Sequence, residues 1–199
     1  MTHAIRDHFE QHAASWDDMM PADLTATLRA FLVPFADDLA SASSVLEIGT
    51  GTGILIPLLQ EYASAARLVS IDLAHTMLQY ARQRCPDARL VQADVHRLPF
   101  STHGAFDLVV CHNSFPHFAD GAGALRAIGR VLVPGGGLLI LHNNSRERVN
   151  AIHSRVGGPI AYDWLPPGEK LHEMLVAARY QDVAVEDSDQ RYVARGQWP

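Results

Sequence analysis

The chain has 199 residues, 48% hydrophobic and 19% charged, with 16 basic and 22 acidic side chains that give a net charge of −6. This size and composition are typical of a single globular domain. An acidic chain without a cluster of Lys and Arg does not suit a nucleic acid partner, and no apolar run is long enough to span a membrane. The start, Met1–Arg6, has no apolar signal core, and Cys85 and Cys111 are too few for a disulfide framework. We therefore expect a cytoplasmic protein.

Helices and strands are predicted to alternate along the chain. Ile5, Phe9 and Trp16 recur at helical spacing, and a second helix with a broad apolar face begins near Pro21 and reaches Leu39. Strands are expected at 45–48, 68–71, 90–93, 106–111 and 137–142, helices at about 54–62, 74–84, 125–132, 145–155 and 171–178, and a closing hairpin at 182–187 and 190–195. This alternation predicts a parallel sheet with helices on both faces and an added antiparallel strand.

The most informative segment is Val45–Gly53, where a short apolar strand ends in Glu47 and three glycines follow at alternate positions. Glycine lets the backbone adopt positive φ and lets a ligand approach the main chain closely. Such a turn after a first parallel strand is where open α/β sheets bind nucleotides. The dinucleotide fingerprint does not fit, because Ile54 stands where it needs a small residue, and no Gly-Lys-Ser/Thr of a P-loop follows. Glu47 suits a ligand that carries an ammonium group.

The next two strands also end in carboxylates. Asp72 lies about twenty residues after the glycines, where it can accept both hydroxyls of a ribose. Asp94 is placed to accept from an adenine amino group, with Val95 against the ring. Both aspartates can instead be ordinary caps or turn residues. Leu73 and Met77 can pack on the adenine, although an apolar helix stripe more often belongs to the core.

These features resemble the motifs of the class I methyltransferases, which bind S-adenosylmethionine (SAM). The glycine loop matches the first motif of that family. Further segments are similar to its later motifs in order and spacing: Ile71–Arg82, Ala93–Phe100, Phe106–Phe118 and Arg130–Gly136. The resemblance covers about residues 43 to 141, and the segment His8–Asp17 is similar to one that closes over SAM in the small-molecule branch. It implies a three-layer α/β sandwich whose seven-stranded, mostly parallel sheet has the order 3-2-1-4-5-7-6, with the last strand antiparallel.

The same resemblance implies roles for individual residues. It assigns the glycine loop to the methionine moiety, Asp72 to the ribose and Asp94 to the adenine. The expected cofactor-binding residues are Phe9, Trp16, Glu47, Gly49, Thr50, Gly51, Gly53, Asp72, Leu73, Met77, Asp94, Val95 and His112. We expect one domain over 1–199, with an N-terminal helical lid at 1–40, a cofactor-binding core at 43–141 and an acceptor-side segment with the closing hairpin at 142–199.

Histidines dominate the expected acceptor side. His112 and His142 end neighbouring strands, so we expect both to face one cleft, where either can act as a general base. Alternatively, His112, His117, His142 and His153 can hold a divalent metal that lowers the acceptor's pKa. A third possibility is that these histidines only line the pocket.

Three functions follow, of which methyl transfer from SAM to a small-molecule acceptor at O, S, N or C is favoured. The alternatives are a metal-assisted methyltransferase that uses the histidines, or a SAM-fold binding protein without transfer activity. A nucleotide-binding oxidoreductase is disfavoured by the glycine spacing. The loop after the fourth strand lacks the Asn-Pro-Pro-Tyr or Asp-Pro-Pro-Tyr sequence of amide and adenine N-methylation. We expect neither a nucleic acid nor a membrane as partner.

Overall fold

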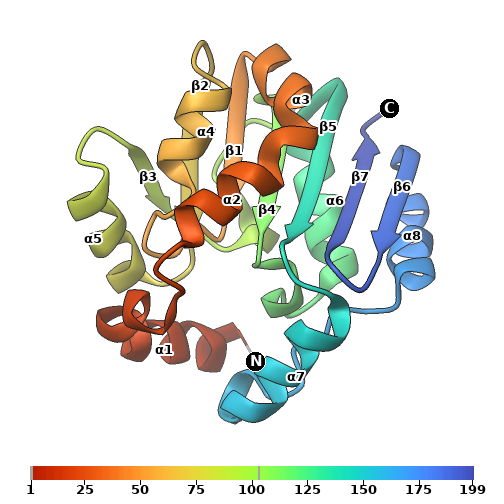
Figure 1. Ribbon diagram of the computed structural model, residues 1–199. Helices are drawn as coiled ribbons and strands as arrows, with labels where there is room; N and C mark the ends of the chain where they lie inside the picture. Colours follow the sequence, from red (N-terminus) through yellow and green to blue (C-terminus); the bar gives the residue numbers. More distant parts are fainter. Residues whose placement is uncertain (1, 103) are drawn as a thin grey trace.

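The computed structural model describes residues 2–102 and 104–199. Figure 1 shows a central sheet with helices on both sides of it. The strands are β1 (Ser44–Ile48), β2 (Arg67–Asp72), β3 (Arg89–Gln92), β4 (Phe106–His112), β5 (Leu132–His142), β6 (Gln181–Asp187) and β7 (Tyr192–Gln197). The α-helices are α1 (Thr2–His12), α2 (Leu24–Leu32), α3 (Ala36–Ser41), α4 (Ile56–Tyr62), α5 (His75–Arg84), α6 (Gly121–Val131), α7 (Arg146–Val156) and α8 (Gly168–Ala177). Short 3-10 turns η1 to η6 lie at Ala13–Ser15, Asp17–Met19, Val33–Phe35, Val95–Arg97, Phe115–His117 and Gly158–Ile160.

The seven strands form one sheet in the order β3-β2-β1-β4-β5-β7-β6. Strands β1 to β5 pair in parallel, and β7 runs antiparallel to both β5 and β6. This confirms the fold class, strand order and antiparallel seventh strand. The parallel arrangement brings the carboxyl ends of β1 to β5 to one edge of the sheet, where α1 and α7 lie (Figure 1).

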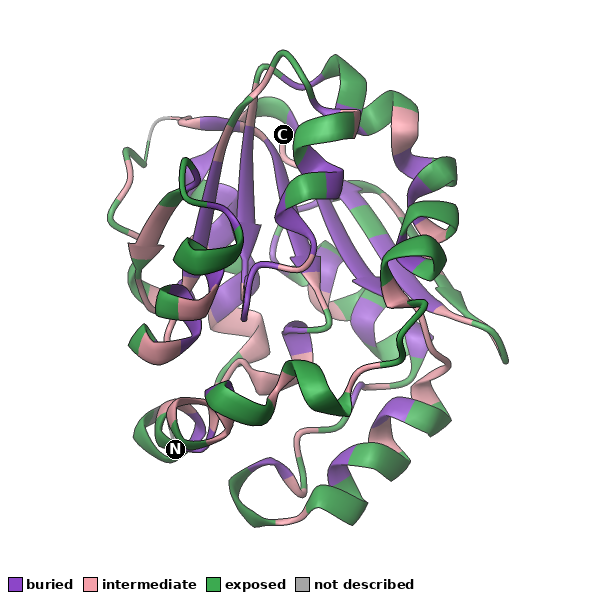
Figure 2. Ribbon diagram, turned by 60° about the vertical axis from the view of Figure 1, so that its left-hand side comes forward, coloured by how far each residue is buried: buried purple, intermediate pink, exposed green. Residues whose placement is uncertain are grey.

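Alternate residues of each strand feed two separate hydrophobic cores. Leu138 and Ile140 of β5 face the core that α6 and α8 cover, whereas Leu139 and Leu141 face the core beneath α2, α3 and α4. Side chains alternate between faces with a period of two, so a central strand flanked by helices is apolar on both sides. Figure 2 shows the result as buried strands between helices whose outer faces are exposed.

The helix predicted from Pro21 to Leu39 is interrupted. Helix α2 ends at Leu32, the turn η3 contains Pro34, and α3 begins at Ala36. Proline has no N–H for the helical hydrogen-bond ladder, and its ring clashes with the carbonyl four residues earlier. Both pieces still bury their apolar residues, Leu28, Leu32 and Leu39, against the sheet. None of the helices in the described ranges is long and apolar enough to cross a membrane.

Candidate functional site

The glycine loop folds over the ends of β1 and β2. The N–H groups of Gly49 and Thr50 both donate to the carbonyl oxygen of Ile71, at 2.9 and 3.0 Å. Gly49 has a φ of +80° and lies against Ser114, whose Cβ would be 2.4 Å from a Cβ at position 49. Gly51 also has a positive φ, +55°, yet no heavy atom lies within 4 Å of where its Cβ would stand. Gly49 is therefore needed for close packing, whereas Gly51 leaves open space above the loop.

Glu47 lies beneath this loop and does not line the cavity beside it. Its side chain is buried, and its Oε2 accepts a hydrogen bond from the Thr50 hydroxyl at 2.8 Å. Burial raises the pKa of Glu47 to about 7, and the nearby Asp72 carboxylate adds to the effect. In this position Glu47 supports the loop from below.

Asp72 and Asp94 stand at the ends of β2 and β3. Oδ2 of Asp72 accepts from the Gly51 N–H, and its Oδ1 accepts from the Ala74 N–H, both at 2.8 Å. Burial raises the pKa of Asp72, although these N–H groups pull it down. Oδ1 of Asp94 accepts from the backbone N–H of His96 at 2.9 Å and lies 2.7 Å from its Nδ1. Both aspartates thus hold local turns and still have lone pairs for a ligand.

One cavity opens at the carboxyl ends of β1 to β4 and reaches the N-terminal segment. Of the expected cofactor-binding residues it is lined by Phe9, Trp16, Gly49, Thr50, Gly51, Asp72, Leu73, Met77, Asp94, Val95 and His112. Glu47 and Gly53 lie outside it; a Cβ on Gly53 would be 3.0 Å from the Cβ of Ala81, so this glycine packs against α5. No Lys or Arg belongs to the lining within residues 2–102 and 104–199.

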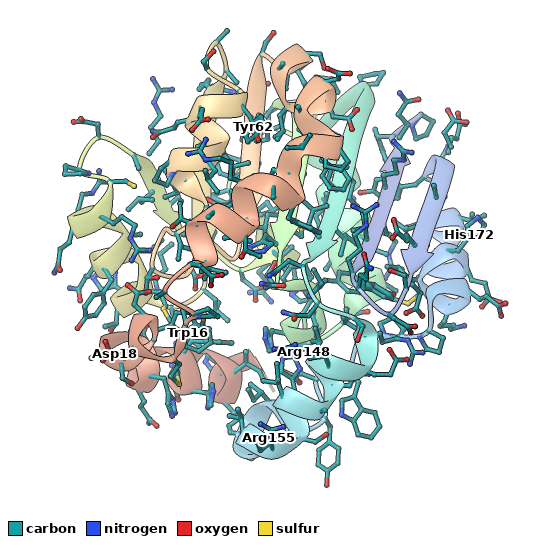
Figure 3. The ribbon with its side chains drawn as sticks, viewed as in Figure 1. Trp16, Asp18, Tyr62, Arg148, Arg155 and His172 are labelled. Atoms are coloured by element: carbon teal, nitrogen blue, oxygen red, sulfur yellow. The ribbon has the colours of Figure 1, made fainter. Side chains whose placement is uncertain are left out.

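The N-terminal segment packs on α5 and closes one side of the cavity. The Glu10 carboxylate accepts from the backbone N–H groups of His75 and Thr76, at 2.6 and 2.7 Å, at the start of α5. Phe9 and Trp16 pack beside a small buried cluster that contains Met77. Figure 3 shows Trp16 between the N-terminal helix and the body of the domain. A second link runs from Asp17 to the Thr52 hydroxyl, at 2.7 Å, and to Arg84.

His112 and His142 do not share a cleft. His112 lines the cavity, and its ring lies 6.4 Å from that of Phe31 on the α2 face of the sheet. His112 pairs in register with Leu141, so these two side chains lie on the same face of the sheet. His142 follows Leu141 and therefore projects from the opposite face, toward Tyr192. Burial lowers the pKa of His112 to about 4 and that of His142 well below its usual 6.5. Neither ring nitrogen of the buried His142 has a hydrogen-bond partner in the described chain.

His117 is the better-supported histidine of the site. It lines the cavity, and its Nδ1 lies 2.8 Å from Oδ2 of Asp163, with both side chains mostly buried. Its ring lies 4.9 Å from that of Phe9 and 4.8 Å from that of His153. Within the described ranges, no three His, Cys, Asp or Glu side chains are arranged to hold a metal ion. The geometry therefore does not support the alternative in which the four histidines share a metal.

The cavity also has walls made by residues to which the sequence analysis gave no individual role. Asn113 and Ser114 follow β4, and Asn113 has a φ of +50°, a left-handed conformation that asparagine tolerates better than most residues. Such strain clusters at functional sites, so an Asn directly after a strand was the available signal. The Ser114 hydroxyl donates to the carbonyl oxygen of Ile48 at 2.7 Å. Ile5, Met20, Leu24 and Phe118 complete an apolar end.

Known proteins with similar sequences are methyltransferases. Residues 46–140 match the family model described as "Methyltransferase domain". A demethylmenaquinone methyltransferase of Thermus thermophilus is 42% identical over 101 residues, which cover 49% of this chain and 46% of that protein. A malonyl-[acyl-carrier protein] O-methyltransferase of Brevibacillus brevis is 29% identical over 97% of this chain and 74% of that protein. The chain thus spans less than half the length of the first curated relatives that it matches.

Solved structures agree in fold. A SAM-dependent methyltransferase of Thermotoga maritima, titled a possible histamine N-methyltransferase, superposes with a TM-score of 0.74 over 98% of this chain and 100% of that one, at 17% identity. One of Aquifex aeolicus gives a TM-score of 0.71 at 16% identity, over 96% and 98% of the two chains. The chain therefore contains a methyltransferase domain over residues 46–140, and its strand order and structural neighbours show that it has the fold of the class I, SAM-dependent methyltransferases.

Proposed function

We propose that this protein transfers a methyl group from SAM to a small, uncharged acceptor. The observation that carries the proposal is the cavity at the strand ends, which has two carboxylates on one side and apolar and histidine side chains on the other. Family members use SAM as methyl donor, and its positive charges suit a lining with Asp72 and Asp94 and with no described cation.

The residues present fit this cofactor. The open space above Gly51 leaves room for a ligand against the backbone, which a side chain at that position would fill. Asp72 has lone pairs left for ribose hydroxyls. Oδ2 of Asp94 has no hydrogen-bond partner among residues 2–102 and 104–199 and can accept from an adenine amino group. Leu73, Met77 and Val95 supply apolar contact. Glu47 acts through the loop that it supports.

When bound, SAM supplies an electrophilic methyl group on a sulfonium. The chain contributes mainly proximity, alignment and exclusion of water, for which Phe9 and Trp16 close one side of the cavity. We assign His112 to contact with the acceptor rather than to proton removal, because its low pKa makes it a weak base at neutral pH. His142 does not reach the cavity and can act only through its neighbours.

The lining also favours one kind of acceptor. The relatives are named for demethylmenaquinone and for the malonyl-acyl-carrier protein, and another for trans-aconitate. A polycarboxylate needs cationic partners when it is buried, and the described lining offers none. An aromatic or aliphatic acceptor without net charge fits Ile5, Met20, Leu24 and Phe118 better.

Calorimetric titration with SAM, S-adenosylhomocysteine and NAD tests the first part of the proposal. We expect heat of binding with the first two and none with NAD; the reverse would favour an oxidoreductase. A screen of phenols, thiols, amines and carboxylates with SAM labelled in the methyl group tests the second part. Transfer to carboxylates alone would contradict the assignment of an uncharged acceptor.

A further inference from the structure

The pair of His117 and Asp163 differs from the other His–Asp pair of the cavity, His96 and Asp94, because Nε2 of His96 lies against the backbone of Asp120, 3.0 Å from its carbonyl oxygen. His117 comes from η5, after β4, and Asp163 from the loop after η6, yet Nδ1 and Oδ2 are 2.8 Å apart. A carboxylate only accepts hydrogen bonds, so Nδ1 of His117 carries a proton. In the neutral ring the lone pair is then on Nε2, to which no protein group of the described chain is hydrogen-bonded. His117 also lines the cavity, so this basic nitrogen is available there.

Asp163 is itself held in place. Its backbone N–H donates to the carbonyl oxygen of Ile160 at 3.0 Å, and its own carbonyl oxygen lies 2.5 Å from Nδ1 of His153. A carbonyl accepts only, so His153 donates this hydrogen bond. The carboxylate therefore has a fixed position from which it orients the ring of His117. A base oriented by a third group is the arrangement that proton transfer in catalysis requires.

We propose that His117, oriented by Asp163, is the general base that removes the proton from an acceptor hydroxyl of the phenol or enol type. This inference rests on the proposed methyl transfer and names its acceptor class. The acceptor oxygen forms a bond to the methyl carbon, while the sulfur–methyl bond breaks and its electron pair stays on the sulfur. The hydroxyl proton passes to Nε2 of His117, and the positive charge ends on an imidazolium beside the Asp163 carboxylate.

Other groups around His117 do not take this role. His8 of α1, His142 at the end of β5 and His153 of α7 all face it, and burial lowers the pKa of each below the usual 6.5. None of these three lines the cavity. Asp163 is the acidic group against the ring, with its Oδ2 2.8 Å from Nδ1. The Phe9 ring packs edge-on against that of His117 and adds an apolar neighbour.

One test needs no turnover. A long-range proton–nitrogen NMR spectrum of the wild-type protein with ¹⁵N-labelled histidine reports which ring nitrogen carries the proton, and His117→Gln identifies the signal. We expect Nδ1 to be protonated and Nε2 bare for His117 in the neutral ring. The opposite tautomer would overturn the inference, because Nε2 could then not accept a proton.

The second test compares phenols that are un-ionised at the assay pH with phenols that are already ionised. His117→Gln should lower turnover of the un-ionised set by about 10²–10⁴-fold, the usual contribution of a general base, and leave the ionised set within about tenfold. Asp163→Asn should lower turnover less. It should also weaken the preference for the Nδ1-protonated form of His117 in the NMR spectrum, since an amide can donate as well as accept, which a carboxylate cannot.

Controls separate this inference from the proposed function. His172→Gln on α8 (Figure 3) and Asp87→Asn before β3 are exposed and lie away from the cavity, so both should match the wild type. Binding of S-adenosylhomocysteine shows that each variant is folded.

Equal losses of turnover on both sets of phenols, or no loss, would overturn the role of His117. A wild type that binds SAM but methylates no phenol would overturn the acceptor class alone, whereas failure to bind SAM would overturn the proposed function.

Discussion

Asp72 has two tasks at the level of the single residue, because it caps the backbone of the glycine loop and faces the cavity. We predict that Asp72→Ala weakens SAM binding by about 1–3 kcal/mol, the range for loss of charge-assisted hydrogen bonds. Titration calorimetry measures the change, with Asp87→Asn as the control. Wild-type affinity in Asp72→Ala would exclude contact between this carboxylate and the ribose.

Gly49 and Gly51 offer a matched pair of substitutions. Both have positive φ, which costs a residue with a Cβ about 1–2 kcal/mol. Gly49→Ala would in addition drive its Cβ into Ser114, whereas Gly51→Ala meets only open space. We predict a clearly larger fall in melting temperature for Gly49→Ala, and a folded Gly51→Ala protein that has lost SAM affinity. Normal binding by Gly51→Ala would mean that the loop has only a structural role.

The sequence analysis identified those side chains of the site that belong to local motifs. The alternate glycines and the aspartates at two strand ends are set by spacing within a few residues, so Gly51, Asp72 and Asp94 could be placed at the cavity in advance. His117 and Asp163 are 46 residues apart and both lie in turns, so no periodicity links them. The prediction also put the side chain of His142 in one cleft with that of His112. It compared only the ends of the two strands and ignored that successive side chains of a strand point to opposite faces of the sheet.

At the level of elements, the hydrophobic pattern located most strands to within one residue. The exceptions have physical reasons. Strand β5 begins at Leu132 rather than near residue 137, because Phe106 pairs with Leu132. The register then shifts, since β5 advances by five residues while β4 advances by two, before Leu108 pairs with Gly137. The hairpin strand β7 begins at Tyr192, two residues later than predicted. Turn geometry sets such boundaries, and an apolar pattern does not report it.

The N-terminal elements are the part of the molecule that we propose to be a lid. Glu10 holds α1 to the start of α5, whose preceding residues Asp72 and Leu73 line the cavity. We predict that hydrogen exchange over residues 3–20 slows when S-adenosylhomocysteine binds, because the ligand fills the space beneath Phe9 and Trp16.

Glu10→Gln provides the matched variant for the lid. It removes the charge from the cap at the start of α5 and should speed exchange over residues 3–20 in the free protein, while exchange in the β4 strand stays unchanged. Equal protection of residues 3–20 with and without ligand would mean that this segment is part of the rigid core.

At the scale of the whole molecule, buried ionisable groups set how stability depends on pH. Burial lowers the pKa values of His112 and His142, so below pH 6.5 the unfolded chain binds protons that the folded chain does not. Each of these histidines then costs about 1.4 kcal/mol of stability per pH unit as the pH falls. Glu47 has a pKa raised to about 7, so between pH 7 and 4.5 the folded chain binds a proton that the unfolded chain does not. In that range Glu47 increases the stability of the folded chain as the pH falls.

Four histidines with lowered pKa values (His8, His112, His142 and His153) against two carboxyl groups with raised ones (Glu47 and Asp72) give a net loss of stability on acidification. Substitutions should change the slope of this loss in opposite directions. Glu47→Gln removes the stability that protonation of Glu47 contributes. The free energy of unfolding should therefore fall more steeply between pH 6.5 and 5, by about 1.4 kcal/mol more per pH unit. His142→Phe keeps an aromatic ring beside Tyr192 and removes two unpartnered nitrogens, so the fall should be shallower by a similar amount. Urea unfolding at pH 6.5, 6.0, 5.5 and 5.0 measures the three slopes. Parallel lines for wild type and both variants would show that these buried groups keep the same protonation in the folded and unfolded chains.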